Sequence, residues 1–248
     1  MRKLLALLFV GAVGILLLYV VASMPPMGDG QSPANSHLAP YYREAGLSDT
    51  GSHNLVTGVT INYRGYDALA KVTVIFTALA ALLAILGRER KGRGYALPDV
   101  SPIRPSPAVL TAAKLVIPFI LLFSIYIILS GEIRPGGGFQ GGAIIGASLI
   151  LYTTVFGLKE ATGRIPRALR FPLEGLAVLT VFLIGLAGIV GGVTFLTFML
   201  PHVSSGLQPD VRQWMTMVAE IGIGVGDAAV LISLLFALSR EEGLVGGK

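Results

Sequence analysis

Six long apolar runs constrain this chain more than any other feature of its sequence. They cover residues 4–23, 69–86, 110–130, 139–158, 173–200 and 215–238. Each is near the ~20 residues that a helix needs to cross a bilayer. None shows the two-residue alternation of a barrel strand, so only helices satisfy their backbone groups in lipid. The sequence therefore predicts an all-α integral membrane protein with about six transmembrane helices, located as a multi-pass protein in the cell membrane.

The composition excludes several classes of protein. Hydrophobic residues make up 53% of the 248 residues, charged residues make up 13%, and the mean hydropathy is +0.74. A soluble domain carries about 25% charged residues, so a soluble enzyme and a disordered protein are both excluded. The chain has no cysteine and three histidines, which leaves no thiolate nucleophile, disulfide or iron–sulfur ligand. We expect no catalytic residue, no metal and no cofactor in this chain.

The first apolar run has two interpretations. Arg2 and Lys3 precede it, as basic residues precede the apolar region of a secretory signal peptide. That region is normally about 7–15 residues long and ends in small residues. The run over 4–23 is longer and is followed by Met24 and Pro25. We therefore expect a retained transmembrane helix.

The basic residues are distributed unevenly among the loops. If the N-terminus is cytoplasmic, 13 Lys and Arg residues lie inside, 4 lie outside and 2 lie near span ends. Short cytoplasmic loops carry an excess of Lys and Arg, so we expect both termini in the cytoplasm and residues 24–64 outside. The net charge of +5 then reflects the placement of the loops, and we expect no nucleic-acid partner.

Proline and charge mark one internal boundary. The stretch from Arg88 to Pro107 is first basic and then proline-rich, as a linker is. We expect a two-span unit over 1–90, a cytoplasmic linker over 91–107 and a four-span unit over 108–248. The chain shows no internal repeat, so the inverted repeats of a transporter are not expected within it.

A glycine-rich stretch lies between the third and fourth apolar runs. A phosphate-binding loop would need a strand before it and Lys-Ser/Thr after its last glycine, and neither is present. Small residues on one helix face let helix backbones approach closely in lipid. We interpret the stretch as a tight turn followed by a helix-packing surface, made of Pro135, Gly136, Gly137, Gly138, Gly142 and Gly146.

Two carboxylic acids lie within the last apolar run. Glu220 and Asp227 are seven residues apart, so both face the same side of a helix. An ionisable group near the centre of a spanning helix costs about 2.5–3.5 kcal/mol and is usually functional. Three glycines between them leave room for water or for backbone close by, and a hydrated notch there would allow proton or cation movement. The alternatives are a structural partner on another subunit or a helix displaced toward an interface.

Four further ionisable residues are candidates for an ion or proton pathway, with weaker support. Glu174 follows Phe171-Pro172-Leu173, a pattern typical of a helix start, where an acid stabilises the positive end of the helix dipole. Lys71 and Lys114 are close enough to span ends for their side chains to reach the headgroups. Asp67 lies among tyrosines at the outer end of the second span, as in an interfacial aromatic belt.

Two segments resemble the Mrp-type multisubunit cation/proton antiporters. Residues 56–60 and 63–69 (VTGVT and YRGYDAL) resemble the C-terminal end of the large A subunit. Residues from 107 to about 240 resemble the four-span B subunit, with FSIY at 123–126, PGGGF at 135–139 followed by GG at 141–142, and Glu220-Ile221-Gly222 in the last helix. The family usually has Gly-Glu where this chain has Ala70-Lys71.

The resemblance implies a function. A short A-like unit joined to a B-like unit is typical of archaeal membrane-bound hydrogenases and related sulfur-reducing respiratory complexes. It implies a non-catalytic membrane subunit of a Na⁺/H⁺ antiporter module, whose partners are other membrane subunits, the lipid bilayer, Na⁺ and H⁺. The alternatives are a subunit of a stand-alone Mrp antiporter and a structural subunit that carries no ions.

Overall fold

The computed structural model describes residues 2–88, 105–198 and 207–245, and every regular element in these ranges is a helix. Six helices are long and apolar enough to cross a membrane, so the predicted all-α fold with six spans is confirmed. The contacts divide the chain into two compact units, Met1–Ala45 and Gly46–Lys248. Most of the predicted linker, residues 91–104, lies outside the described ranges.

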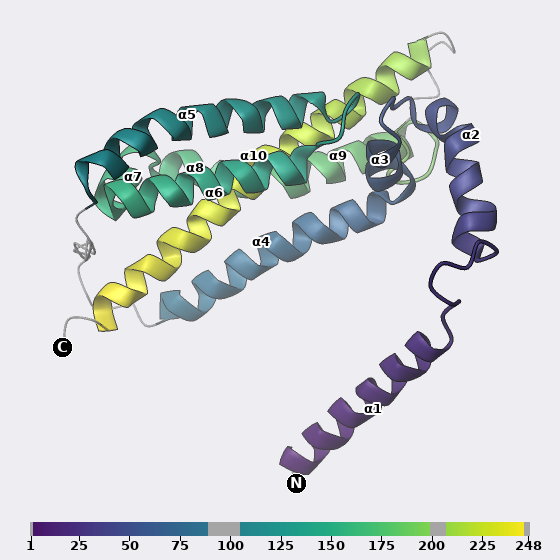
Figure 1. Cartoon of the computed structure of the whole chain (residues 1–248), viewed down its shortest axis with the longest axis horizontal. Coiled ribbons are helices and arrows are strands. Elements are labelled where there is room, and N and C mark those ends of the chain that lie inside the picture. Colours follow the sequence, from purple (N-terminus) through teal and green to yellow (C-terminus); the bar gives the residue numbers. More distant parts are fainter. Residues whose placement is uncertain (1, 89–104, 199–206, 246–248) are drawn as a thin grey trace. The chain divides into compact units, whose positions relative to one another are not determined.

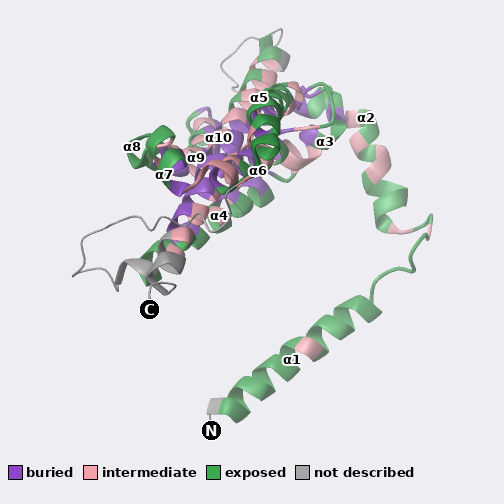
Figure 2. Cartoon of the chain, turned by 60° about the vertical axis from the view of Figure 1, so that its left-hand side comes forward, coloured by how far each residue is buried: buried purple, intermediate pink, exposed green. Residues whose placement is uncertain are grey.

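The first unit contains one long helix and the start of another. Helix α1 covers Arg2–Ala22 and is apolar on all its faces. Its large side chains are exposed (Figure 2), from Leu4 at 61% to Val21 at 64%. A helix that is hydrophobic all round is suited to a lipid environment. A short π-helix, η1 (Ala34–Leu38), leads into α2 (Ala39–Thr50), which ends in the second unit.

The second unit is built around its last helix. The helices before it are α3 (Leu55–Thr57), η2 (Gly58–Tyr63), α4 (Gly65–Arg88), α5 (Pro107–Ser130), α6 (Gly138–Phe156), α7 (Leu158–Arg164), α8 (Arg167–Glu174) and α9 (Leu176–Val190). The last, α10 (Gln208–Val245), packs against α4, α5, α6, α8 and α9 (Figure 1). Its span is 67% buried, whereas every other span is 33% buried or less. The polar residues Thr216, Glu220, Asp227 and Ser233 of α10 are accordingly buried.

The turn between α5 and α6 depends on glycine. Helix α5 begins where the Ser106 side chain accepts a hydrogen bond from the Val109 N–H, with Pro107 in the first turn, as expected of an N-cap. Gly137 precedes α6 and has a φ of +131°. Residues other than glycine rarely adopt this backbone conformation. The chain can therefore reverse direction in the short segment between Ser130 and Gly138 and begin α6.

The fifth apolar run differs from the sequence prediction. Pro172 and Glu174 do not begin a helix, because α8 already starts at Arg167 and ends at Glu174. Helix α9 ends at Val190 in a Schellman motif, in which the Val193 N–H bonds the Gly188 carbonyl across Gly192 with φ of +84°. The run stays apolar beyond this point, so hydropathy alone places the helix end too late.

Candidate functional site

Glu220 lies at the junction of α10 and α6. Its side chain is buried, with 4% of the residue exposed, and its Oε2 accepts a short hydrogen bond from the backbone N–H of Gly138. Gly138 is the first residue of α6, where the N–H groups have no partner within the helix. A carboxylate is also stabilised at this positive end of the helix dipole. The sequence places an anion where the backbone can hold it.

The glycine turn is shaped around this carboxylate. A Cβ atom on Gly137 would lie 2.9 Å from Oε1 and 3.0 Å from Oε2 of Glu220. A Cβ atom on Gly138 would collide with the backbone carbonyl of Glu220. On the other side of the turn, a Cβ atom on Gly136 would lie 2.7 Å from the Ile127 carbonyl oxygen. Pro135 precedes the three glycines of this turn. These glycines allow α10 to reach the start of α6.

The glycine stripe of α6 continues this close approach along α10. A Cβ atom on Gly142 would lie 2.6 Å from the carbonyl oxygen of Gly224 and 3.2 Å from Cβ of Asp227. One turn later, a Cβ atom on Gly146 would lie 2.7 Å from a methyl group of Leu231. The two helix backbones approach closely at each of these positions, which small residues permit.

Asp227 is buried in the same interface, with 5% of the residue exposed. Of the two uses expected for the three glycines before it, water or close backbone, the structure shows close packing and not a water-filled notch. A Cβ atom on Gly222 would lie 2.5 Å from Thr180 Oγ1, one on Gly224 2.6 Å from an Ile128 methyl group, and one on Gly226 2.6 Å from the Ala177 nitrogen. The missing side chains give room to the neighbouring helices rather than to water.

The structure leaves three of the predicted pathway residues on exposed surfaces. Asp67 is exposed and forms an ion pair with Arg64, which is also exposed. Lys71 is exposed, with its Nζ 5.5 Å from the centre of the Phe139 ring. Lys114 is exposed and lines a cavity of about 660 Å³. These residues are available to lipid or to another subunit, whereas Glu220 and Asp227 are enclosed.

Glu174 belongs to a buried polar network that sequence reasoning missed. The Ser233 hydroxyl donates a hydrogen bond of 2.6 Å to Oε1 of Glu174, and Nη1 of Arg170 donates one of 2.5 Å to the Ser233 oxygen. The Arg170 guanidinium also lies 4.5 Å from the centre of the Phe236 ring. The signal was the spacing of Arg170 and Glu174, which places them on one helix face.

A second missed residue is Glu132, in the turn after α5. Only 3% of it is exposed, and neither carboxyl oxygen has a hydrogen-bond partner among the described residues. Burial raises the pKa of Glu132 to about 7, and the Glu220 carboxylate contributes to this rise. Its signal in the sequence was a charged residue two positions after an apolar run.

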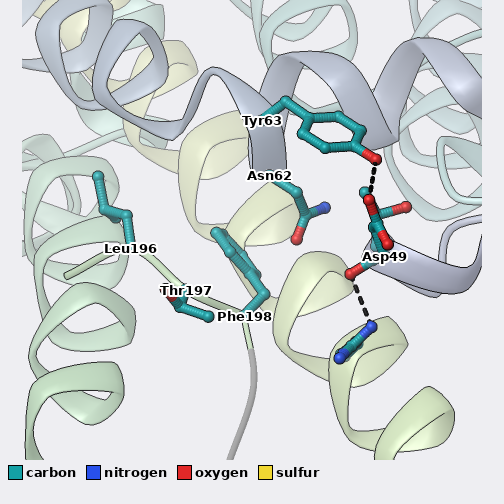
Figure 3. A pocket seen from close by; sticks show the side chains of 8 residues that line it. Asp49, Asn62, Tyr63, Leu196, Thr197 and Phe198 are labelled. Atoms are coloured by element: carbon teal, nitrogen blue, oxygen red, sulfur yellow. Dashed lines mark hydrogen bonds between the residues drawn. The ribbon is translucent and has the colours of Figure 1, made fainter. Parts of the chain in front are cut away.

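A small pocket opens near the N-terminal end of α10, which contributes Arg212 to its lining. It has a volume of about 150 Å³ and is lined by residues of α2, η2, α10 and the segment after α9 (Figure 3). The Tyr63 hydroxyl bonds Oδ2 of Asp49 at 2.7 Å, and Nη1 of Arg212 bonds the Asp49 carbonyl at 2.6 Å. Asn62 donates to Oγ1 of Thr216 at 3.4 Å, one helical turn before Glu220. Within the described ranges, no three metal-binding side chains gather.

Comparison with known proteins identifies the family to which the second half of the chain is similar. Residues 108–235 match a family described as a domain related to the MnhB subunit of Na⁺/H⁺ antiporters. The B subunit of the Na⁺/H⁺ antiporter of Bacillus subtilis (strain 168) is 30% identical over 132 residues, which are 53% of this chain and 92% of that protein. The resemblance to antiporter B subunits is therefore confirmed.

Two solved structures share the fold over nearly the whole chain. One is the membrane-bound sulfane sulfur reductase, an archaeal respiratory membrane complex, which has a chain that is 30% identical with a TM-score of 0.60. The match covers 94% of this chain and 98% of that one. The other is the Mrp complex from Dietzia sp. DQ12-45-1b, with 24% identity and a TM-score of 0.63 over 97% of this chain and 26% of that one. The latter likeness concerns the fold alone.

Proposed function

The chain belongs to the family of domains related to the MnhB subunit of Na⁺/H⁺ antiporters, and from this premise we propose that it is a non-catalytic membrane subunit of a cation/proton antiporter module. The observation that carries this proposal is the buried position of the Glu220 side chain at the start of α6. A carboxylate enclosed among spanning helices is costly unless it is held by hydrogen bonds. Here the first N–H of α6 holds it, and the glycines around it leave space for that contact.

In this proposal, the module is part of a respiratory complex that couples electron transfer to ion movement. The likeness to the archaeal sulfane sulfur reductase supports this, because it extends over 94% of this chain and 98% of the other at 30% identity. Electron-transfer chemistry then belongs to other subunits, and this chain carries no cofactor. Its partners are those subunits, the bilayer, Na⁺ and H⁺.

A mass-spectrometric inventory of the intact purified complex tests the respiratory assignment. We expect this subunit to purify together with iron–sulfur subunits of a sulfur-reducing or hydrogenase-like enzyme. Co-purification with antiporter subunits alone would instead identify a stand-alone Mrp antiporter.

The transport assignment is tested in vesicles that contain the assembled complex. We expect sodium-dependent proton movement, and we expect it to fall in Glu220→Gln but not in Glu160→Gln. Glu160 is a suitable control because its side chain is 53% exposed and forms an exposed ion pair with Arg164. Normal transport after replacement of both Glu220 and Asp227 would favour a structural subunit that carries no ions.

A further inference from the structure

The turn between α5 and α6 contains a buried acid that the sequence did not draw attention to. We infer that Glu132 is a second proton-exchanging carboxyl of this subunit and that it passes protons to and from Glu220. This inference rests on the proposed function, and it adds the group from which Glu220 would receive its proton.

The first support is that Glu132 is enclosed without a partner. Only 3% of the residue is exposed, and both side-chain oxygens are buried with no hydrogen bond among the described residues. Leaving a buried acceptor unpaired costs about 1–3 kcal/mol, and more if it is charged. Such a group in a folded protein requires an explanation, and a functional role provides one.

The second support is that the backbone of the turn is held independently of this carboxyl. The Asn54 side chain donates 2.7 Å hydrogen bonds to the carbonyls of Gly131 and Arg134, and the Asn54 N–H donates one of 2.8 Å to the Glu132 carbonyl. The Thr57 hydroxyl donates to the Gly131 carbonyl at 2.6 Å. The carboxyl of Glu132 is therefore not needed as a tether.

The third support is the position of Glu132 relative to Glu220. A Cβ atom on Gly131 would lie 2.8 Å from Cα of Gly137. On Gly137, in turn, it would lie 2.9 Å from Oε1 of Glu220. Gly131, the residue before Glu132, thus packs against the glycine that contacts the Glu220 carboxyl. The Glu220 charge raises the pKa of Glu132, as expected for two carboxyls near each other.

Other ionisable groups lie on this turn and on described segments near it. Besides Glu220 on α10, the turn itself carries Arg134, whose Nη1 bonds the Tyr126 hydroxyl at 2.8 Å. Lys71 on α4 lies over the Phe139 ring, and His53, in the segment between α2 and α3, is exposed. With burial as the main cause, the pKa of Glu132 is raised to about 7, and the nearby Ser52 hydroxyl offsets part of the rise. That hydroxyl donates its hydrogen bond to the Asn54 carbonyl at 3.0 Å, so it does not pair the Glu132 carboxyl. A carboxyl with such a pKa gains and loses a proton near neutral pH.

Two substitutions at Glu132 separate a proton-exchanging role from a structural one. Glu132→Gln keeps the shape and removes titration, whereas Glu132→Asp keeps titration and shortens the side chain. We expect Glu132→Gln to lower sodium-dependent proton movement per assembled complex at least about tenfold, and Glu132→Asp to retain most of it. A structural role predicts the opposite order. Glu160→Gln, the exposed control, should transport at the wild-type rate.

The outcomes for the two acids are distinguishable. Normal transport in Glu132→Gln with loss in Glu220→Gln would overturn this inference and leave the proposed function intact. Normal transport in both variants would overturn both. Loss in Glu132→Gln with normal transport in Glu220→Gln would also overturn it, because Glu132 would then act without Glu220.

A second measurement covers the case in which Glu132→Gln fails to assemble. A hydrophobic carbodiimide modifies buried carboxyls in their protonated form, and mass spectrometry of the wild-type complex locates the adduct. We expect an adduct on Glu132 at about pH 6 that decreases toward about pH 8, as its proton is lost. An unmodified Glu132 throughout this range would overturn the inference.

Discussion

At the residue scale, the buried charged groups differ in how the protein holds them. Glu220 is bonded by a backbone N–H at the start of α6. Glu174 is joined to Arg170 through the Ser233 hydroxyl. In Glu132 the carboxyl has no partner among the described residues. Because burial without a partner is unfavourable, the Glu174 arrangement stabilises the fold, whereas Glu220 and the unpaired Glu132 are where we expect proton exchange.

The Arg170 network gives a prediction about stability. Arg170→Ala removes the hydrogen-bond donor to Ser233 and leaves Glu174 as an incompletely compensated buried acid. Losing a hydrogen bond from a charged group costs about 1.5–3 kcal/mol. We expect a lower midpoint of thermal dissociation for the purified complex, or loss of assembly. Arg167→Ala, an exposed position on the same helix, is the matched control, and equal effects of the two variants would contradict this account.

At the scale of elements, the interface of α6 and α10 decides how the second unit packs. The sequence predicted its main components. The fourth span was expected over 139–158 and is found over Gly138–Phe156, and the four-residue glycine spacing was visible because helical periodicity is regular. What it could not predict is which helix faces the stripe, because that depends on contacts between residues about 80 positions apart.

Gly142→Leu tests this interface. A leucine would collide with the Gly224 backbone, where even a Cβ atom would lie 2.6 Å from the carbonyl oxygen. Backbone cannot move aside as a flexible side chain can, so we expect less assembled complex, with near-normal transport in whatever complex does form. The measurement is the yield of intact complex on native gels. Gly163→Leu is the control, since nothing lies within 4 Å of a Cβ atom there. Normal assembly of Gly142→Leu would show that the helices do not pack as described.

At the scale of the whole molecule, hydropathy predicted more than local patterns did. Six spans follow from length and composition, and the structure contains them. The predicted end of the fifth span was too late because α9 stops at a glycine turn inside an apolar run. The acids Glu132 and Glu220 could not be paired from the sequence, since a tertiary contact brings their segments together. Hydropathy reports burial in lipid, whereas these features depend on packing between helices.

The orientation in the membrane is a prediction from the 13 to 4 distribution of basic residues between the two sides. It can be measured by cysteine labelling, because the native chain contains no cysteine. Ser48 is exposed and lies in the segment expected outside. We expect an impermeant thiol reagent to label Ser48→Cys from the outside in intact cells. Labelling only from the cytoplasmic side would reverse the topology.

The central claim is that Glu220 exchanges protons during cation/proton antiport. The most direct measurement is the initial rate of sodium-dependent proton movement in vesicles, normalised to assembled complex, for wild type, Glu220→Gln and Asp227→Asn. Both variants keep the shape of the side chain and remove its titration. We expect a greater loss in Glu220→Gln than in Asp227→Asn, because Glu220 alone of the two is held at the start of α6. A wild-type rate in Glu220→Gln together with loss in Asp227→Asn would contradict the claim.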